Sequence, residues 1–397
     1  MTVVVLAVSM IPASASALYA CLGVLADSDI KFIVETAYTS HDVISIDSDI
    51  DFTAENGVGS GSGTEGDPYL IEGWDIDASL STGISISNTS SWIVIREVRI
   101  HATNYGQSGF CIRLSNVSHC TVDNCILADK GTALLIQQST DCKLVSSLTG
   151  VSSSDPSIVW GWAGHITVNG GHDIEIRNCT IHGELSFWCT VDANWTNYLT
   201  TFSSGVLVSE NRVWGSISVG GTIDATIVRN QVRGCDVLED PLPHLCFPGA
   251  GIHVSGGIHE QKPIGIVRVV ENEVSGFQAG ISVEPKMPAL VIGNLVTVNY
   301  YGVFVTERTI ATIYNNNFIG NIVQGYYYTG WNLNGGLSPE SHPVVSWDGG
   351  KEIGGNFWSD YVGKDTNGDG FGDRSYKIEE RGTDAFPLMA PYQCPLY

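Results

Sequence analysis

The chain has 397 residues, of which 45 are glycine, 43% are hydrophobic and only 15% carry a charge. This composition is typical of a turn-rich, β-rich chain with a large apolar core. The formal net charge of −23 argues against nucleic acids and anionic membrane surfaces as partners, because both require basic patches.

The first segment, residues 1–26, has no acidic or basic side chain, and small residues cluster at 13–17. It predicts a secretory leader cleaved near Ala17 or Ala20, or an apolar anchor long enough to span a membrane. Leu18 to Cys21 also resembles a lipoprotein cleavage box. Membrane contact is therefore expected only through this segment, and only if it is retained.

Residues 43–78 alternate short apolar stretches with a Gly/Ser-rich turn and predict a first coil with its cap. From Gly83 the apolar stretches recur, and Ile95, Val122, Leu144 and Ile176 align as one inward row with spacings of 27, 22 and 32 residues. The uneven spacings indicate insertions near 149–163 and 184–205.

The clearest repeat lies at 269–320, where Asn272, Asn294 and Asn316 stand 22 residues apart. Asn211 and Asn230 continue this register, and the 42 residues from Asn230 to Asn272 predict two coils. Asparagine tolerates the left-handed conformation at a bend, and stacked asparagines can hydrogen-bond as a ladder. The period predicts an all-β, right-handed parallel β-helix of about ten to twelve coils with a cap at each end. The alternative is a set of strand-turn units in a sandwich.

Two cysteine pairs are disulfide candidates in an exported protein. Cys120 and Cys142 lie 22 residues apart in one row, so adjacent coils would bring them within disulfide range, although a stacked pair of buried thiols fits equally well. Cys235 and Cys246 bracket an Asp/Pro-rich loop that a disulfide would close.

Four Asn-x-Ser/Thr triplets permit glycosylation, at Asn88, Asn116, Asn178 and Asn194. Asn178 lies in the repeat register, which predicts partial burial. Aromatic residues cluster near 160, near 187–198 and at 326–331; they could stack on sugars or contact a protein, or instead seal loops onto the solenoid.

The C-terminal segment contains the strongest ligand motif. Asp365, Asn367, Asp369 and Asp373 occupy positions 1, 3, 5 and 9 of a loop, and Phe371 offers its carbonyl at position 7. This is the oxygen spacing of a calcium loop. Position 12 is Tyr376 rather than Glu, so a completing carboxylate would have to come from Asp360 or Asp384. An Asx-rich turn without metal is the alternative.

Two groups of residues near the ends of the chain carry a family resemblance. The first is Asp51, Phe52, Gly61, Gly63, Thr64, Asp67, Pro68, Tyr69, Ile71, Glu72, Gly73 and Trp74, and the second is Asn356, Trp358, Ser359, Asp360, Tyr361, Tyr376, Asp384, Pro387, Leu388, Met389 and Pro391. They resemble the first and closing segments of the NosD-like β-helix repeat family. The resemblance covers roughly 43–392. It implies an exported or cell-surface protein of a kind frequent in archaea, and the family also includes a periplasmic copper-site maturation factor.

These observations divide the chain into a leader or anchor at 1–26, an N-terminal cap and first coil at 27–82, coils at 83–330 and a C-terminal cap at 331–397. They favour a noncatalytic, calcium-stabilised structural or adhesive protein of the extracellular space or cell surface, such as a subunit of a surface layer or filament. Its expected partners are further copies of itself or surface polysaccharide. One alternative is a polysaccharide-acting enzyme that uses Asp173 and Glu175, or Asp236, Glu239 and Asp240; no nearby basic residue supports it. The other is metal handling by His165, His172, His182, His253 and His259, which follow no coil period.

Overall fold

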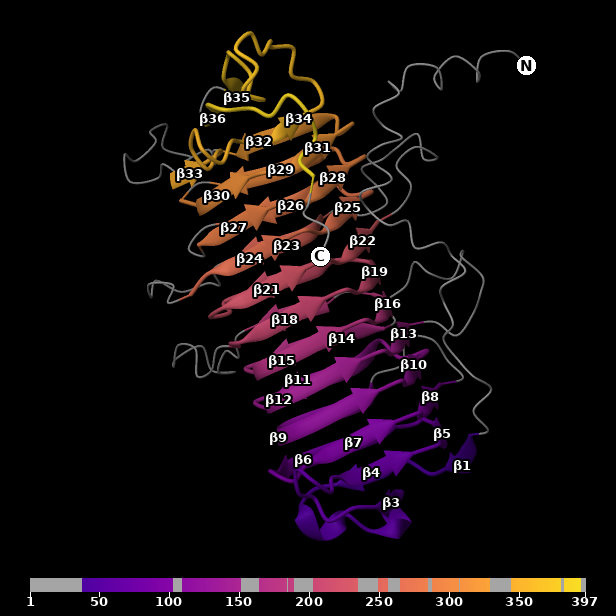
Figure 1. The fold of residues 1–397 in the computed structure, drawn as a ribbon. Coiled ribbons are helices and arrows are strands. Elements are labelled where there is room, and N and C mark those ends of the chain that lie inside the picture. Colours follow the sequence, from indigo (N-terminus) through magenta and orange to yellow (C-terminus); the bar gives the residue numbers. More distant parts are fainter. Residues whose placement is uncertain are drawn as a thin grey trace, which may run out of the picture.

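The computed structural model describes residues 38–102, 109–150, 164–183, 185–188, 203–234, 249–255, 265–284, 288–306, 308–328, 344–379 and 382–393. These residues form one long stack of short strands (Figure 1). Within these ranges no helix has the length and apolarity needed to cross a membrane. The leader or anchor segment at 1–26 lies outside the described residues.

Three parallel sheets run along the stack. Sheet A contains β1 (Thr39–His41), β5 (Trp74–Asp77), β8 (Arg99–His101), β10 (Ile126–Ala128), β13 (Leu148–Gly150), β16 (Thr180–His182), β19 (Arg212–Trp214), β22 (Gln231–Arg233), β25 (Glu273–Ser275), β28 (Leu295–Thr297), β31 (Asn317–Ile319) and β34 (Phe357–Trp358). Its 12 strands agree with the predicted number of coils.

The other two sheets are joined through β9 (Phe110–Asp123), which passes from sheet B into sheet C. Sheet B contains β2 (Ile44–Ile46), β6 (Ile84–Thr89), β11 (Thr132–Gln137), β14 (His165–Asn169), β17 (Leu185–Trp188), β20 (Ile217–Gly220), β23 (Ala250–Ser255), β26 (Ala279–Val283), β29 (Tyr301–Thr306) and β32 (Val323–Tyr328). Sheet C contains β3 (Val58–Ser60), β4 (Tyr69–Glu72), β7 (Ile93–Arg96), β12 (Thr140–Val145), β15 (His172–Arg177), β18 (Val206–Ser209), β21 (Ala225–Val228), β24 (Val267–Val270), β27 (Ala289–Ile292), β30 (Ile310–Tyr314) and β33 (Val344–Ser346).

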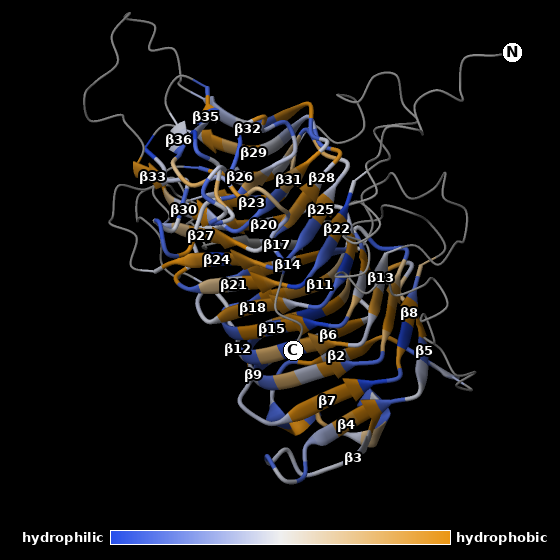
Figure 2. Ribbon diagram, turned by 45° about the horizontal axis from the view of Figure 1, so that its top comes forward, coloured by the Kyte–Doolittle hydropathy of each residue, from blue (hydrophilic) through white to orange (hydrophobic). Residues whose placement is uncertain are grey.

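The coils enclose a continuous apolar core. Along each strand one side chain in two points inward, and Figure 2 shows the hydrophobic residues following the stacked strands. The predicted inward row is confirmed, because Ile95 pairs with Val122, Val122 with Leu144 and Leu144 with Ile176, all with 0% exposure. Full burial of one such side chain contributes about 1.5–3 kcal/mol.

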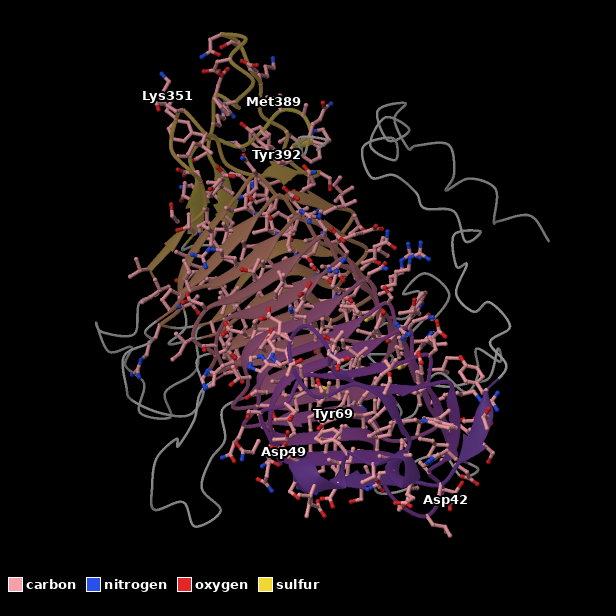
Figure 3. All side chains as sticks on the ribbon, turned by 60° about the horizontal axis from the view of Figure 1, so that its bottom comes forward. Asp42, Asp49, Tyr69, Lys351, Met389 and Tyr392 are labelled. Atoms are coloured by element: carbon pink, nitrogen blue, oxygen red, sulfur yellow. The ribbon has the colours of Figure 1, made fainter. Side chains whose placement is uncertain are left out.

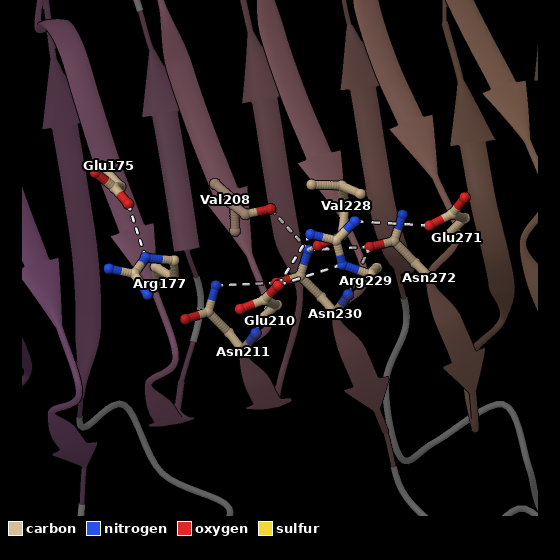
Figure 4. A network of polar contacts seen from close by, with 10 residues as sticks. All are labelled: Glu175, Arg177, Val208, Glu210, Asn211, Val228, Arg229, Asn230, Glu271 and Asn272. Carbon is tan, nitrogen blue, oxygen red and sulfur yellow. Dashed lines mark hydrogen bonds and ion pairs between the residues drawn. The ribbon is translucent and has the colours of Figure 1, made fainter. Parts of the chain in front are cut away.

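An asparagine ladder runs along the corner between sheets C and A. Asn211, Asn230, Asn272, Asn294 and Asn316 are at most 1% exposed. In each pair the side-chain Oδ1 of one asparagine accepts hydrogen bonds from both the backbone N–H and the Nδ2 of the asparagine one coil earlier, at 2.8–3.0 Å. Figure 4 shows the first three members.

Two details of the predicted register are wrong. Asn230 and Asn272 lie on adjacent coils rather than two coils apart, because β22 pairs directly with β25; the extra chain length lies within that one coil. The left-handed residue at the bend is also not the ladder asparagine but the residue before it, as at Glu210, Arg229 and Glu271 with φ of 59°, 54° and 56°. That conformation turns the chain so that the asparagine points inward.

Earlier coils fill the same corner with smaller groups. The N–H of Cys125 donates to Ser147 Oγ, and the N–H of Cys179 donates to Asn211 Oδ1, at 3.0 and 2.9 Å. The backbone donors of Cys125 and Cys179 are therefore satisfied although neither residue has an amide side chain.

Each end of the stack has a different cap (Figure 3). At the N-terminal end η3 (Asp49–Asp51), η4 (Ala54–Asn56) and the antiparallel β3–β4 pair follow β2, and Phe52 stacks on Tyr69 with ring centroids 4.2 Å apart. At the C-terminal end residues 344–393 carry the antiparallel pair β35 (Tyr376–Ile378) and β36 (Gly382–Asp384).

Asp384 ends the asparagine ladder. This carboxylate is 0% exposed and accepts hydrogen bonds from the backbone N–H of Asn356 at 2.7 Å, Trp358 Nε1 at 2.9 Å and the N–H of Phe386 at 3.0 Å. Asn356 is the last asparagine of the ladder, since its Oδ1 accepts from Asn316. Burial outweighs these donors and raises the pKa of Asp384 from 3.8 to about 6.

We expect Asn294→Ala to lower the free energy of unfolding by about 3 kcal/mol or more, because each buried group left without a partner costs about 1–3 kcal/mol. The groups affected are Val269 O and the amides of Asn272. Denaturant unfolding followed by circular dichroism measures the loss. Gln231→Ala, a half-buried position in sheet A, is the control; an equal shift in both variants would contradict the ladder's role.

The raised pKa of Asp384 predicts that the free energy of unfolding depends on pH. Because its folded pKa of about 6 exceeds its ordinary value of 3.8, its stabilising contribution is complete below the ordinary pKa and is lost as pH rises through the folded pKa. Between about pH 4 and 7 the free energy of unfolding of the natural protein should fall by about 2–3 kcal/mol relative to Asp384→Asn, which does not titrate. Parallel pH profiles for the two proteins would contradict this assignment.

Candidate functional site

The long segments inserted between strands come directly before or after strands of sheet B in the sequence. The undescribed segments 103–108, 151–163 and 235–248 each precede a strand of sheet B, and 189–202, 256–264 and 329–343 each follow one. At the corner between sheets C and A, by contrast, one or two residues separate successive strands in every coil up to β30–β31. Because loops on a rigid scaffold usually border functional surfaces, the outer face of sheet B is the candidate functional surface.

Two outward rows cross this face in register. One row contains Ser218, His253, Ser282, Phe304 and Tyr326. The next contains Thr306 and Tyr328, with Glu284 placed directly after β26 and level with Thr306. Small hydroxyl side chains therefore give way to rings toward the C-terminal end of the sheet.

The rings form an aromatic cluster that we define as Tyr301, Phe304, Tyr326 and Tyr328. Tyr301 lies 4.6 Å from Tyr326, and Phe304 lies 5.5 Å from Tyr326 and 6.0 Å from Tyr328, measured between ring centroids. Tyr328 is 44% exposed and the other three are half-buried. The cluster thus presents a partly exposed aromatic surface already held in place by stacking.

The sequence alone placed Tyr326, Tyr327 and Tyr328 in an aromatic segment after the last clear coil. In the structure all three belong to β32, where Tyr327 points into the core with 9% exposure while its two neighbours point outward. Successive side chains of a strand point to opposite faces, and this alternation would have predicted that Tyr327 is buried while Tyr326 and Tyr328 point outward. The other aromatic residues singled out, near 160 and 187–198, have side chains outside the described set.

A His–Glu pair lies beside the cluster. His253 Nε2 is 3.1 Å from Glu284 Oε1, although the ring N–H is not aligned to donate, so the contact is an ion pair when the histidine is protonated. The pair lowers the pKa of Glu284, chiefly through the interaction with His253. Thr306 Oγ1, on the next coil, is buried without a hydrogen-bond partner.

The calcium-loop residues are folded as a hydrogen-bonded turn. Asp365 accepts from the backbone N–H groups of Gly368, Asp369 and Gly370, and Asp373 accepts from Thr366. Asn367 Oδ1 accepts from the N–H of Asp369, and Asp369 Oδ1 accepts from the N–H of Phe371. The suggested completing carboxylates are engaged elsewhere, because Asp360 accepts from Tyr376 and Asp384 is buried in the ladder.

Cys120 and Cys142 lie on adjacent coils as their spacing predicted, and they pair in register. Both are free, buried thiols, which is the second of the two alternatives. Burial raises the pKa of Cys142 to about 12. Cys235 and Cys246 lie outside the described residues.

Three of the glycosylation candidates are exposed asparagines in the left-handed conformation: Asn88, Asn116 and Asn178. The expected partial burial of Asn178 is wrong, because it is the residue before the ladder position and its Nδ2 donates to Ser146 Oγ on the coil below. Asn194 lies outside the described residues.

The carboxylates proposed for catalysis do not form an isolated pair. Glu175 is ion-paired with Arg177 at 2.9 Å (Figure 4), contrary to the expectation that no basic residue accompanies it. Asp173 lies on the same strand and is exposed. Asp236, Glu239 and Asp240 lie outside the described residues.

The fold and the ladder define a parallel β-helix repeat protein. The family described as "Periplasmic copper-binding protein (NosD)" matches residues 91–363, and the chain belongs to this family. No curated protein matches the chain.

Several solved structures share the β-helix shape at low identity. A periplasmic alginate epimerase, AlgG, is 14% identical over 68% of this chain and 67% of its own, with a TM-score of 0.45. An alginate lyase from Paenibacillus is 12% identical over 77% of this chain and 99% of its own, with a TM-score of 0.38. Pectate lyase Pel9A is 13% identical over 78% and 70%, with a TM-score of 0.26.

The family description raises the question of copper, for which imidazole and sulfur are the usual ligands. His165, His172, His182 and His253 are spread over three sheets, and His259 lies outside the described residues. His182 stacks on Trp214, with ring centroids 4.8 Å apart. Across the described residues no three His, Cys, Asp or Glu side chains converge as a metal site, so these residues do not fit copper.

Proposed function

We propose that this protein is a noncatalytic, exported β-helix protein that binds polysaccharide on the outer face of sheet B at the cell surface. The observation that carries the proposal is the aromatic cluster of Tyr301, Phe304, Tyr326 and Tyr328 next to Glu284. Sugar rings pair an apolar C–H face with polar hydroxyls, and a binding surface for them combines aromatic rings with hydrogen-bonding groups. The periplasmic description of the family supports export.

A catalytic role has less support. Hydrolysis of a glycosidic bond ordinarily uses two carboxyl groups across the scissile bond. On the outer rows of β20 to β32, the described residues supply Glu284, and its partner is a histidine rather than a second acid. Binding without turnover is therefore the simpler use of this face.

Replacing the rings tests the proposal. We expect Phe304→Ala and Tyr326→Ala to weaken glycan binding at least about tenfold, or about 1.4 kcal/mol, because each removes stacking area from the cluster. Affinity electrophoresis against a panel of soluble polysaccharides measures the change.

The control is Tyr314→Ala, which removes an outward tyrosine from sheet C. Equal weakening in all three variants would contradict a site on sheet B. Release of sugar products would instead favour the enzyme. Filaments formed by a natural protein that binds no glycan would favour self-assembly.

Calcium is the second part of the proposal: the loop from Asp365 to Asp373 binds calcium and stabilises the C-terminal cap. Support comes from the oxygen ligands at positions 1, 3, 5 and 9 and from the tight turn in which Asp365 accepts hydrogen bonds from the backbone N–H groups of Gly368 and Gly370. Binding requires Asp373 to exchange its contact with Thr366 for the cation.

Chelation should therefore lower the melting temperature of the natural protein by several degrees, because an ion that binds only the folded state stabilises it by mass action. Asp365→Asn should melt lower than the natural protein and should not respond to chelator. A melting temperature unchanged by chelator and restored calcium, measured by differential scanning calorimetry, would rule the calcium out.

A further inference from the structure

The charged residues around the proposed polysaccharide site indicate the charge of its ligand. This inference rests on the proposed function and extends it to a substrate class. We propose that the glycan bound on sheet B is uncharged, and that Glu284 selects it by accepting hydrogen bonds from sugar hydroxyls while repelling acidic chains.

Glu284 is positioned to face a ligand. It follows β26 at the start of an edge that carries insertions, its side chain is 41% exposed, and His253 holds one carboxylate oxygen from the coil below at 3.1 Å. A carboxylate with further acceptor capacity is well suited to hydroxyl donors. It therefore acts as a fixed acceptor beside the rings.

Thr306 Oγ1 lies on the coil after Glu284 and is one of five buried side-chain polar atoms in the described part of the chain that have no hydrogen-bond partner. His253 Nε2 is another of the five, and it lies 3.1 Å from Glu284 Oε1 without an aligned hydrogen bond. Protein covers both atoms, so the group that faces a ligand directly is the exposed carboxylate of Glu284. Sugar hydroxyls can donate hydrogen bonds to this carboxylate.

The charge of this face excludes an acidic chain. On the outer rows of the described sheet B strands from β14 to β32 there is no lysine or arginine. Glu379 of the C-terminal cap lies close enough to Tyr301 to raise the pKa of that phenol, together with the larger effects of burial and neighbouring tyrosines. A polymer of uronic acids would thus place its carboxylates beside Glu284 and Glu379 on a chain of net charge −23, with no lysine or arginine on those outer rows to offset them. Arg308, which is exposed, lies beyond the end of β29, two residues after Thr306.

The experiment compares neutral polymers (cellulose oligomers, mannan, galactan) with uronate polymers (polygalacturonate, alginate) by isothermal titration calorimetry at low salt. The natural protein should bind at least one neutral polymer at least tenfold more tightly than either uronate polymer. Glu284→Lys should lose neutral binding at least tenfold and gain affinity for uronates. Glu284→Gln keeps the shape of the side chain but removes its charge, so it should reduce the difference in affinity between neutral and uronate polymers.

The matched control is Glu55→Lys, an exposed glutamate in η4 at the other end of the solenoid, which changes the net charge equally. If the two lysine variants behave alike, or the natural protein binds uronates as tightly as neutral chains, the substrate class is wrong. If the natural protein binds both classes equally and Phe304→Ala abolishes both, the site on sheet B stands without this selectivity. If the natural protein binds no polymer, the proposed function falls as well. Circular dichroism confirms that each variant is folded.

Discussion

The asparagine ladder is the constraint on which the rest of the structure depends. A typical ladder asparagine donates its Nδ2 to a backbone carbonyl of its own coil and accepts at its Oδ1 from the preceding coil, as Asn294 does with Ile292 and Asn272. These groups are buried, so a coil that shifted by one residue would leave several donors and acceptors without partners. The ladder therefore fixes the register of every coil it joins, and with it the inward rows of all three sheets.

That constraint also explains where the chain is free to vary. A corner that must place one amide on each coil cannot take an insertion, and between sheets C and A the strands are joined by one or two residues until the last coil. The long insertions precede or follow strands of sheet B in the sequence instead. The aromatic cluster and Glu284 lie on the outer face of that sheet. The ladder and the proposed binding face thus occupy different parts of the same coil.

This division also determines how much could be predicted from sequence. The fold and the contact of Cys120 with Cys142 follow from the 22-residue period, which survives wherever a coil has no insertion. The inward row from Ile95 to Ile176 could be aligned across its uneven spacings because each coil repeats the same apolar strand pattern. The step from Asn230 to Asn272 was misjudged because an insertion and an extra coil lengthen the chain alike. The site could not be predicted, because His253, Glu284 and Phe304 meet only through the pairing of strands that lie far apart in sequence.

The final residue of the ladder shows why it ends with a carboxylate. Hydrogen bonds along the ladder have a direction: each backbone N–H donates toward the C-terminal neighbour's oxygen. Asn356 already uses its Nδ2 on Ile313 and Trp347, so what remains is its backbone donor, which points out of the stack. Another asparagine there would accept this N–H but bring two donors of its own and require a further coil. The carboxyl group of Asp384 offers two acceptor oxygens and no N–H donors, and it receives Asn356, Trp358 and Phe386 together. A carboxyl group can thus stop a ladder of this polarity without a further coil, and the cost of burying its charge is the reason that its pKa is raised.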